Sequence, residues 1–395
     1  MAKYIEDEYD EERPRKKSSS GGKSGKKPSG KKSSGKKSSG KNGSSKKQQA
    51  KKQRRRIILF IVEIVALVVA VFLLWGARAV TQGGKVKIEE DDIIINEQVK
   101  EQQETTMKGY RNIALFGVDS TVGALTKNTR SDSIMIASIN QDTGECKLVS
   151  VYRDTYLNLS NDSYNKCNAA YAKGGPEMAI NMLNMNLDMN ITDFVTVGFA
   201  GLTDTIDALG GVYIEVNDVE MGHLNNYQLC MAENLKRDYT PVTSTGYQLL
   251  NGLQATGYCR VRYGGGDDFR RAERQREVMS AIADQAKKAS LSQLTSTANS
   301  VFEETYTSLD LSEITEMLGD IDKYYISEKA GFPQESNRAT GTIGAKGSCV
   351  VPVNLEDNVK WLHQFLFDDY DYEPSATVKK CSDQIYSDTN GYLKK

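Results

Sequence analysis

The pattern of hydrophobic and polar positions divides the chain into three regions. Residues 1–56 carry almost no apolar side chain after Ile5, whereas residues 57–75 form an apolar run that only Glu63 interrupts. From residue 109 onward, short apolar runs alternate with amphipathic stretches. These patterns are typical of a tail without a core, a membrane-spanning helix and a folded domain, in that order.

Short runs rich in β-branched residues predict the strands of the folded domain, and helical spacing predicts its helices. We expect strands at 113–118, 134–139, 148–152, 194–199, 212–216 and 349–353. We expect helices at 176–187, 202–209, 269–288, 291–303, 311–324 and 355–367. The alternation of strands and helices over about 109–290 is typical of a layered α/β domain.

Five segments follow from these patterns. They are a disordered basic tail (1–56), a transmembrane helix (57–75), a linker (76–108), the α/β domain (109–305) and a C-terminal part (306–395) that extends or caps the same domain. The apolar run is nineteen residues long, which suffices to cross a hydrocarbon core of roughly 30 Å as a helix.

The topology of the chain follows from the residues that flank this run. Lys51, Lys52 and Arg54–Arg56 come directly before it, which places the N-terminus in the cytoplasm and the remainder outside. The sequence Ala-Arg-Ala at 77–79 is similar to a signal-peptidase site, but the long leader favours an uncleaved anchor. We therefore expect a single-pass protein of the cell membrane with an extracellular domain.

Charge divides the chain at the same place. The tail holds twenty Lys and Arg against six Asp and Glu, a net charge of +14, so the remaining residues sum to −15. Its Lys-Ser-Gly repeats bury too little surface to offset the entropy of ordering. A nonspecific nucleic-acid-binding arm is one interpretation, but the position before a membrane segment favours contact with membrane lipids. We expect no specific nucleic-acid partner.

The six cysteines follow the membrane segment, in a compartment where disulfides can persist. Their spacing is not that of a metal site. Three occupy apolar positions in regular segments and are expected in the core: Cys146, Cys167 and Cys259. Three others are candidates for disulfides of unknown connectivity: Cys230, Cys349 and Cys381.

Several enzyme classes are excluded by what the sequence lacks. It has two histidines, His223 and His363, and neither lies near a nucleophile or a carboxylate cluster. There is no Gly-x-Ser-x-Gly elbow and no HExxH motif. A histidine-dependent hydrolase and a zinc protease are therefore excluded as interpretations.

Arginines and aspartates stand instead at the ends of the predicted strands. Asp119 closes the first strand, Arg130 and Asp132 open the second, and Arg153 follows the third. Loops at strand ends are where α/β sheets bind ligands. Two carboxylates suit a Mg²⁺ ion that also takes phosphate oxygens, and arginine pairs phosphate oxygens through its planar fork.

A second group of polar residues follows about one hundred residues later. If the segment around Arg260 and Arg262 is extended, these two side chains share a face. The next helix places Asp268, Arg271 and Gln275 on one face. Two arginines that point the same way repel each other unless an anion lies between them, which favours a phosphate site.

Each of these features also has a structural explanation. An Arg–Asp pair such as Arg153 and Asp154 is common on protein surfaces, and Asp268 can interact with free N–H groups at a helix start. The convergence of five arginines and three aspartates at element ends gives the phosphate site its support. From the residues alone, both interpretations stay open.

A series of motifs between about 109 and 290 resembles the LytR–CpsA–Psr family. The motifs are RNIALFGVDS, RSDSIMIASIN, VSVYRDTYL, YNKCNAAYAKGG, DALGGVYIEV, LNGLQATGYCRVRY and DFRRAERQ, in family order and spacing. The resemblance implies an α/β/α sandwich whose apolar cleft takes a polyprenyl chain. It also implies transfer of a glycopolymer phosphate, of teichoic-acid or capsule type, from a polyprenyl pyrophosphate carrier to peptidoglycan.

The resemblance also implies roles for particular residues. Asp119 and Asp132 would hold Mg²⁺ (or Mn²⁺). Arg153, Asp268 and Arg271 would be catalytic, with Asp268 orienting or deprotonating the acceptor. The pyrophosphate would be bound by Arg130, Arg153, Arg260, Arg262, Arg271 and Gln275. Arg270 departs from the family pattern, in which glycine is frequent, and it adds charge beside the site.

Two further functions compete with transfer. A noncatalytic surface protein could bind the lipid-linked glycopolymer and organise wall assembly, but a pure binder needs no metal pair such as Asp119 and Asp132. A pyrophosphatase would release the phosphate to water, and the sequence does not separate water from a sugar as the acceptor.

Overall fold

The computed structural model describes residues 84–86, 88–119, 125–126, 128–262 and 267–393. The predicted tail (1–56) and transmembrane helix (57–75) lie outside these residues, as does the sequence at 77–79. Among the helices that the structure does describe, none is both long and apolar enough to cross a membrane.

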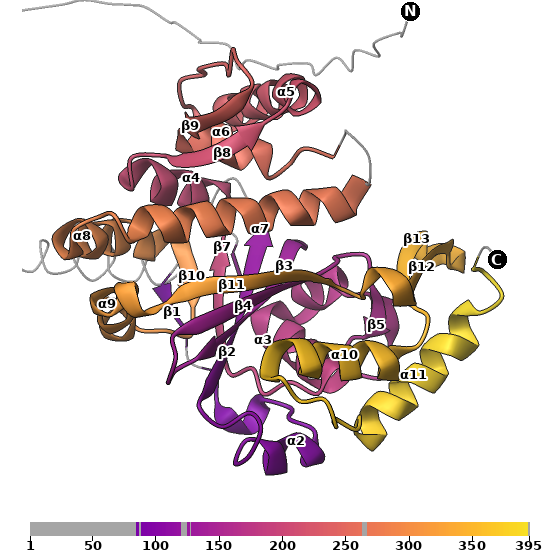
Figure 1. Cartoon of the computed structure of the whole chain (residues 1–395). Helices are drawn as coiled ribbons and strands as arrows, with labels where there is room; N and C mark the ends of the chain where they lie inside the picture. The colour runs from indigo at the N-terminus through magenta and orange to yellow at the C-terminus, as the bar shows by residue number, and fades with distance from the viewer. Residues whose placement is uncertain (1–83, 87, 120–124, 127, 263–266, 394–395) are drawn as a thin grey trace, which may run out of the picture. The chain divides into compact units, whose positions relative to one another are not determined.

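A seven-stranded mixed sheet organises the domain (Figure 1). Its strands in spatial order are β1 (Gly84–Lys85), β10 (Thr305–Thr307), β7 (Asp193–Val197), β2 (Tyr110–Val118), β3 (Ser131–Asn140), β4 (Glu145–Val151) and β11 (Tyr325–Phe332). β2, β3 and β4 form an antiparallel meander, whereas β7 pairs with β2, and β11 with β4, in parallel. The predicted mixed α/β class is confirmed.

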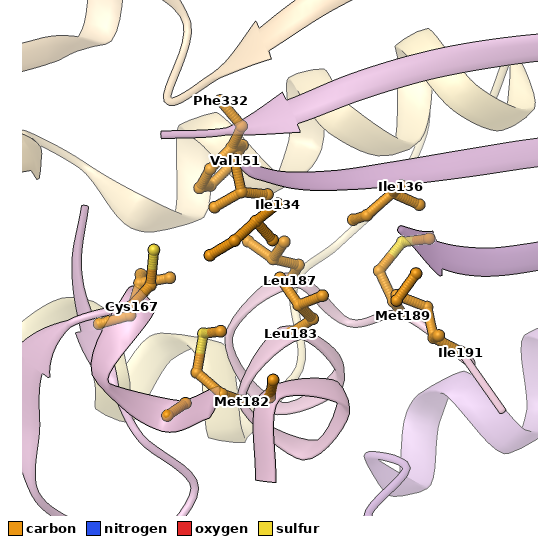
Figure 2. Packing of buried hydrophobic residues seen from close by; sticks show 14 of the residues in the cluster. Ile134, Ile136, Val151, Cys167, Met182, Leu183, Leu187, Met189, Ile191 and Phe332 are labelled. Atoms are coloured by element: carbon orange, nitrogen blue, oxygen red, sulfur yellow. The ribbon is translucent and has the colours of Figure 1, made fainter. Parts of the chain in front are cut away.

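Helices pack on both faces of this sheet, because its central strands are apolar on both sides. In β3, Ile134 and Ile136 join the main core, while Ala137 faces a smaller cluster with Met279. The main core is formed with α3 (Asn168–Leu187), α10 (Leu355–Phe367) and α11 (Ala376–Thr389). Figure 2 shows part of this packing, including Val151, Leu183, Leu187 and Phe332.

The other face is crossed by α7 (Asp267–Ala286), which contacts β4 and β11. Beyond α7, a hairpin packs with three helices around a second core that contains Val212, Leu250 and Tyr258. These elements are β8 (Val212–Val216), β9 (Gly246–Leu250), α4 (Phe199–Ala208), α5 (Asp218–Leu235) and α6 (Gly252–Tyr258). α7 is therefore a shared wall between the sheet and this hairpin layer (Figure 1).

Shorter elements complete the fold. The remaining helices are α2 (Glu97–Gln102), α8 (Leu291–Val301) and α9 (Leu311–Gly319). Two small hairpins are formed by β5 (Tyr156–Asn158) with β6 (Tyr164–Lys166), and by β12 (Arg338–Thr342) with β13 (Ser348–Pro352). Single 3-10 turns are η1 (Glu90–Asp92), η2 (Phe302–Glu304), η3 (Ile321–Lys323), η4 (Glu335–Asn337) and η5 (Gly344–Lys346).

A buried carboxylate joins the C-terminal helices to the rest of the domain. Asp188, the left-handed C-cap of α3, is fully buried and accepts hydrogen bonds from Asn96, Tyr372 and Ser375. His363 stacks on Tyr372, and its Nε2 lies 3.0 Å from the Leu187 carbonyl oxygen. Burial lowers the pKa of His363 to about 4, so this histidine is neutral and structural.

Several elements differ from the prediction for identifiable reasons. α3 begins eight residues before Pro176, but Gly175 has a φ of 71° that breaks the helix, so the predicted start is the start of its second half. The strand predicted to reach Phe199 ends at Val197, because Phe199 begins α4. All six cysteines are free thiols, so the proposed disulfides of Cys230, Cys349 and Cys381 are not formed.

Replacing Asp188 by Asn tests the buried network. The change puts an amide N–H₂ against donors, so we expect the free energy of unfolding to fall by about 3 kcal/mol. Chemical denaturation measures this loss. Asp383→Asn, on the exposed face of α11, is the matched control and should unfold like the parent protein. Equal stability of Asp188→Asn and the control would contradict a role for this network.

Candidate functional site

The ends of three strands meet at one edge of the sheet. β2 ends at Val118 opposite Ser131, where β3 begins, and β4 ends nearby at Val151. The register shifts between Gly117 and Val118, so that Asp132 is the extra residue of a β-bulge. A bulge changes the direction of a side chain and is frequent beside active sites.

Arg153 is the centre of a cluster of charged side chains at this edge. Its Nη1 donates to Asp132 Oδ1 at 2.8 Å, and its Nη2 donates to Asp268 Oδ2 at 3.2 Å. Asp132 comes from β3, Arg153 follows β4, and Asp268 lies in the first turn of α7. Burial alone would lower the pKa of Arg153, but these two carboxylates raise it.

α7 adds a second guanidinium to the cluster. Arg271 Nη1 lies 3.3 Å from Asp268 Oδ1, and Arg271 Nη2 donates to the Asp132 carbonyl at 3.2 Å. Burial, together with the charge of Arg153, lowers the pKa of Arg271 to about 10, so Arg271 stays protonated at neutral pH. Its Nε is buried and has no hydrogen-bond partner among the described residues. This donor is therefore available to a ligand.

Asp268 is held between several arginines. Its Oδ1 also lies 3.6 Å from Arg262 Nε. Burial by itself would raise the pKa of this carboxyl, but the charges of Arg271 and Arg153, and then of Arg262, hold it below its usual range. A third carboxylate, that of Asp154, lies 3.9 Å from Arg153 Nε and pairs with Lys166 at 3.1 Å. Four cationic side chains thus stand against three carboxylates, which leaves the cluster with a net charge of +1 that attracts an anion.

The expectation that Arg260 and Arg262 share a face is wrong. The segment is not extended, because turn hydrogen bonds continue from α6 through Arg260 N and Val261 N. Arg260 lies over the rings of Phe199 and Tyr227, at 4.6 and 5.3 Å from their centroids. Arg262 reaches the charged cluster, whereas Arg260 lines the cavity described below.

A fully buried ion pair fixes this turn. Arg274 Nε donates to Glu220 Oε1 at 2.8 Å, and Arg274 Nη1 donates to the Val261 carbonyl at 2.9 Å. The pair joins α7, α5 and the segment that carries Arg262. The sequence did not reveal this role, because Arg274 alone is compatible with the solvated face of a helix.

The remaining predicted residues lie around the cluster. Asp119 and Arg130 are exposed at the same edge of the sheet. No ion pair joins either of them to Arg153 or Asp268 among the described residues. Gln275, one turn after Arg271, donates weakly to the Cys259 carbonyl at 3.5 Å and lines both the cluster and the cavity.

The carboxylates fit a magnesium site that phosphate completes. The strand register brings the ends that carry Asp119 and Asp132 together. Mg²⁺ takes one or two carboxylates and keeps waters or phosphate oxygens as its other ligands. No group of three or more His, Cys, Asp or Glu in the described ranges could hold a metal by itself. The donor set therefore suits an ion that arrives with a phosphate.

An apolar cavity of about 220 Å³ opens beside the cluster. Its walls come from β2, β3 and β7 on one side and from α4, α6 and α7 on the other. Among the lining side chains are Leu115, Phe116, Met135, Val278, Met279 and Ile282. Arg260 and Gln275 are its polar residues of note, and Ser133 and Gln275 line both the cavity and the charged cluster.

The C-terminal part contributes an aromatic clamp that sequence reasoning missed. The Arg338 guanidinium lies 3.9 Å from the Phe269 ring centroid, and its Nη1 donates to the Tyr152 hydroxyl at 3.0 Å. The two rings meet edge to face at 4.6 Å. Tyr152 precedes Arg153 and Phe269 follows Asp268, so the clamp holds both neighbours of the ion pair.

A profile of the LytR_cpsA_psr family matches residues 79–343, a stretch that contains the whole cluster and the clamp. The chain belongs to the LytR–CpsA–Psr family. The resemblance of its motifs is thereby confirmed.

Relatives within the LytR–CpsA–Psr family carry different names. The chain is 32% identical over 43% of its length to "Biofilm regulatory protein A" of Streptococcus mutans, covering 43% of that protein. It is 28% identical over 56% of its length to "Polyisoprenyl-teichoic acid--peptidoglycan teichoic acid transferase TagU" of Enterococcus faecalis, covering 70% of it. The chain spans about half the length of most curated relatives that it matches.

Solved structures show the same fold. A structure described as "TagT bound to LIIa-WTA" superimposes with a TM-score of 0.51 at 23% identity, covering 66% of this chain and 92% of that one. At this identity the similarity establishes the LytR–CpsA–Psr fold. The chemistry of the site follows from its geometry.

Removing the clamp should loosen the site locally. For Arg338→Ala we expect the free energy of unfolding to fall by about 1–2 kcal/mol. Faster amide hydrogen exchange should appear near Arg153 and in the first turn of α7. Lys346→Ala, an exposed change in the turn of the same hairpin, is the control. Unchanged exchange at both segments in Arg338→Ala would show that the clamp does not position the ion pair.

Proposed function

We propose that this protein transfers a phosphate-linked glycopolymer, of teichoic-acid or capsule type, from a polyprenyl pyrophosphate carrier to peptidoglycan. The observation that carries the proposal is the position of the Arg153 cluster at the side of an apolar cavity. A lipid pyrophosphate has the same two parts, an apolar chain joined to a compact anion. The name of the relative from Enterococcus faecalis describes the same reaction.

The cavity suits the prenyl chain, because its walls offer apolar contact to a ligand that water excludes. Gln275 and Ser133, which line both the cavity and the cluster, lie where such a chain would meet its pyrophosphate. Arg153, Arg271 and Arg262 then face the phosphate oxygens. Each guanidinium can exchange a carboxylate contact for a bidentate phosphate contact, so the anion is bound without leaving a buried cation unpaired.

The reaction replaces a phosphoanhydride bond of the carrier by a phosphate ester bond to the acceptor. An acceptor hydroxyl oxygen bonds to the phosphorus that carries the polymer, and the bond from this phosphorus to the bridging oxygen breaks. The polyprenyl monophosphate leaves with the electron pair. The arginines stabilise the charge that develops on the phosphate oxygens, which supplies most of the catalysis in phosphoryl transfer.

Asp268 is the residue that orients the acceptor hydroxyl and receives its proton. Its carboxyl is ionised while the arginines contact it. When phosphate oxygens take over these guanidinium groups, the carboxylate loses part of its stabilisation and becomes a stronger base. This coupling would delay proton transfer until the donor is bound.

A divalent cation completes the proposal. Asp119 and Asp132 would hold Mg²⁺ (or Mn²⁺). The bound ion would neutralise part of the negative charge of the pyrophosphate. The apolar run at 57–75 would anchor the protein in the cell membrane, with its N-terminus in the cytoplasm and the α/β/α domain outside. This arrangement places the site on the side where peptidoglycan lies.

Substitution of the central ion pair tests the proposal. Arg153→Ala and Asp132→Ala should each lower the transfer rate about a hundredfold or more, because a charge at the phosphate or metal is lost. Transfer is measured as polymer that becomes attached to peptidoglycan from a polyprenyl-pyrophosphate donor. Arg153→Lys should recover only part of the rate, since lysine lacks the planar fork.

Lys379→Ala, an exposed change on α11, serves as control, and cooperative unfolding of every variant shows that the fold persists. Undiminished transfer by both variants of the pair would contradict the site. Donor binding without any product in the parent protein would favour the scaffold instead. Release of free phosphate-ended polymer as the sole product would favour a pyrophosphatase.

Metal dependence is a separate expectation. Chelation by EDTA should abolish transfer, and added Mg²⁺ or Mn²⁺ should restore it. In Asp119→Asn the metal concentration for half-maximal rate should rise about tenfold, because one ligand charge is lost. Asp383→Asn should leave this concentration unchanged. A rate that is insensitive to EDTA in the parent protein would exclude the metal from the mechanism.

A further inference from the structure

A second hollow lies on the opposite face of α7 from the apolar cavity. Its volume is about 800 Å³, and its walls come from the β8–β9 hairpin, α7 and the edge strand β11. Along α7, Val278, Met279 and Ile282 face the apolar cavity, whereas Glu277, Asp284 and Gln285 face this polar groove. The helix thus separates two compartments of opposite chemistry.

Two exposed tyrosines form the hairpin wall of the groove. Tyr213 and Tyr247 stack on each other with ring centroids 5.5 Å apart and an interplanar angle of 22°. Tyr247 is 71% exposed and Tyr213 is 43% exposed. Lys288 lies over the Tyr213 ring at 5.7 Å. Large rings displayed together on a surface mark ligand-binding positions more often than chance.

The charges of the groove indicate which ligand it suits. Acidic and basic side chains line it in equal number, four of each. A polyanion such as a phosphate-linked glycopolymer meets as many carboxylates as cations here, so the groove offers it no net electrostatic attraction. Sugars with few charges have hydroxyl groups at their edges, which form hydrogen bonds with carboxylates, amides and ammonium groups. They also have flat C–H faces, which pack on aromatic rings. Tyr247 and Asp284 together provide both kinds of contact.

The groove and the charged cluster both draw residues from the start of α7. Arg270 lines its end and is the neighbour of Arg271, which belongs to the charged cluster. From Arg270 to its end at Ala286 the helix rises about 24 Å, at roughly 1.5 Å per residue, a length that suits several sugar units in a row. A polymer lying along this face would end beside Asp268, while the lipid occupies the other face.

We infer that this groove, bounded by Tyr213, Tyr247, Glu277, Asp284, Lys288 and Lys329, binds the acceptor glycan strand of peptidoglycan. The inference rests on the proposed function and adds an acceptor subsite, which α7 separates from the donor site. Arg270 stands at the point where the strand would reach the cluster.

Direct binding tests the groove independently of catalysis. The probe is a soluble tetrasaccharide of alternating N-acetylglucosamine and N-acetylmuramic acid, titrated into the full chain in detergent micelles. Tyr247→Ala should weaken its affinity about tenfold, the size of one aromatic contact, and Asp284→Ala should weaken it in the same direction. Tyr370→Ala, whose ring is 73% exposed between α10 and α11, is the matched control and should bind like the parent.

Transfer kinetics supply the second measurement. In Tyr247→Ala the KM for the tetrasaccharide should rise about tenfold, with the donor KM and the rate at saturating acceptor unchanged. If the parent protein binds the tetrasaccharide through the groove but transfers no polymer, the inferred binding site stands and the proposed function is refuted. Transfer that is insensitive to Tyr247→Ala and Asp284→Ala would refute the groove alone. Equal tetrasaccharide affinity in all variants, or competition by lipid-free glycopolymer instead, would also overturn the inference.

Discussion

The double ion pair of Arg153 is the interaction on which the rest of the site depends. Two carboxylates from separate elements converge on one guanidinium that is largely withdrawn from water. Such a charge is costly to bury unless it is paired, so β3, the end of β4 and the start of α7 are constrained to one geometry. The same constraint favours ligand exchange, because a phosphate can replace either carboxylate without leaving the guanidinium unpaired.

α7 extends from this constrained cluster and separates the apolar cavity from the polar groove. Its first turn supplies Asp268 and Arg271 to the cluster, and its later turns present apolar side chains to the cavity and charged side chains to the groove. The buried pair of Arg274 with Glu220 fixes the helix to α5 on the side away from the sheet. A single element therefore aligns the apolar cavity, the charged cluster and the groove, which is the preorganisation that the proposed phosphoryl transfer requires.

Much of this arrangement could be predicted from local sequence. The central strands are short β-branched runs, and α10 was predicted at its observed bounds because its apolar positions recur at helical spacing; in the structure Asn354 caps it. Polar, edge-exposed β11 was missed, since only its last residue, Phe332, is buried. Arg153, Asp268 and Arg271 were predicted because strand ends and helical spacing are local properties. Arg260 was misplaced because the turn that follows α6 depends on tertiary packing.

The Arg338 clamp marks the limit of such prediction. Its hydrogen bond to Tyr152 joins residues 186 positions apart, and no local pattern specifies a contact of that kind. Yet it determines how the C-terminal part relates to the site. β10 and β11 complete the sheet, Asp188 ties α11 to α3, and Arg338 reaches the neighbours of the ion pair. The residues beyond the family motifs thus contribute to the geometry of the cluster, because a cation packed against two touching aromatic rings restricts the segments that carry them.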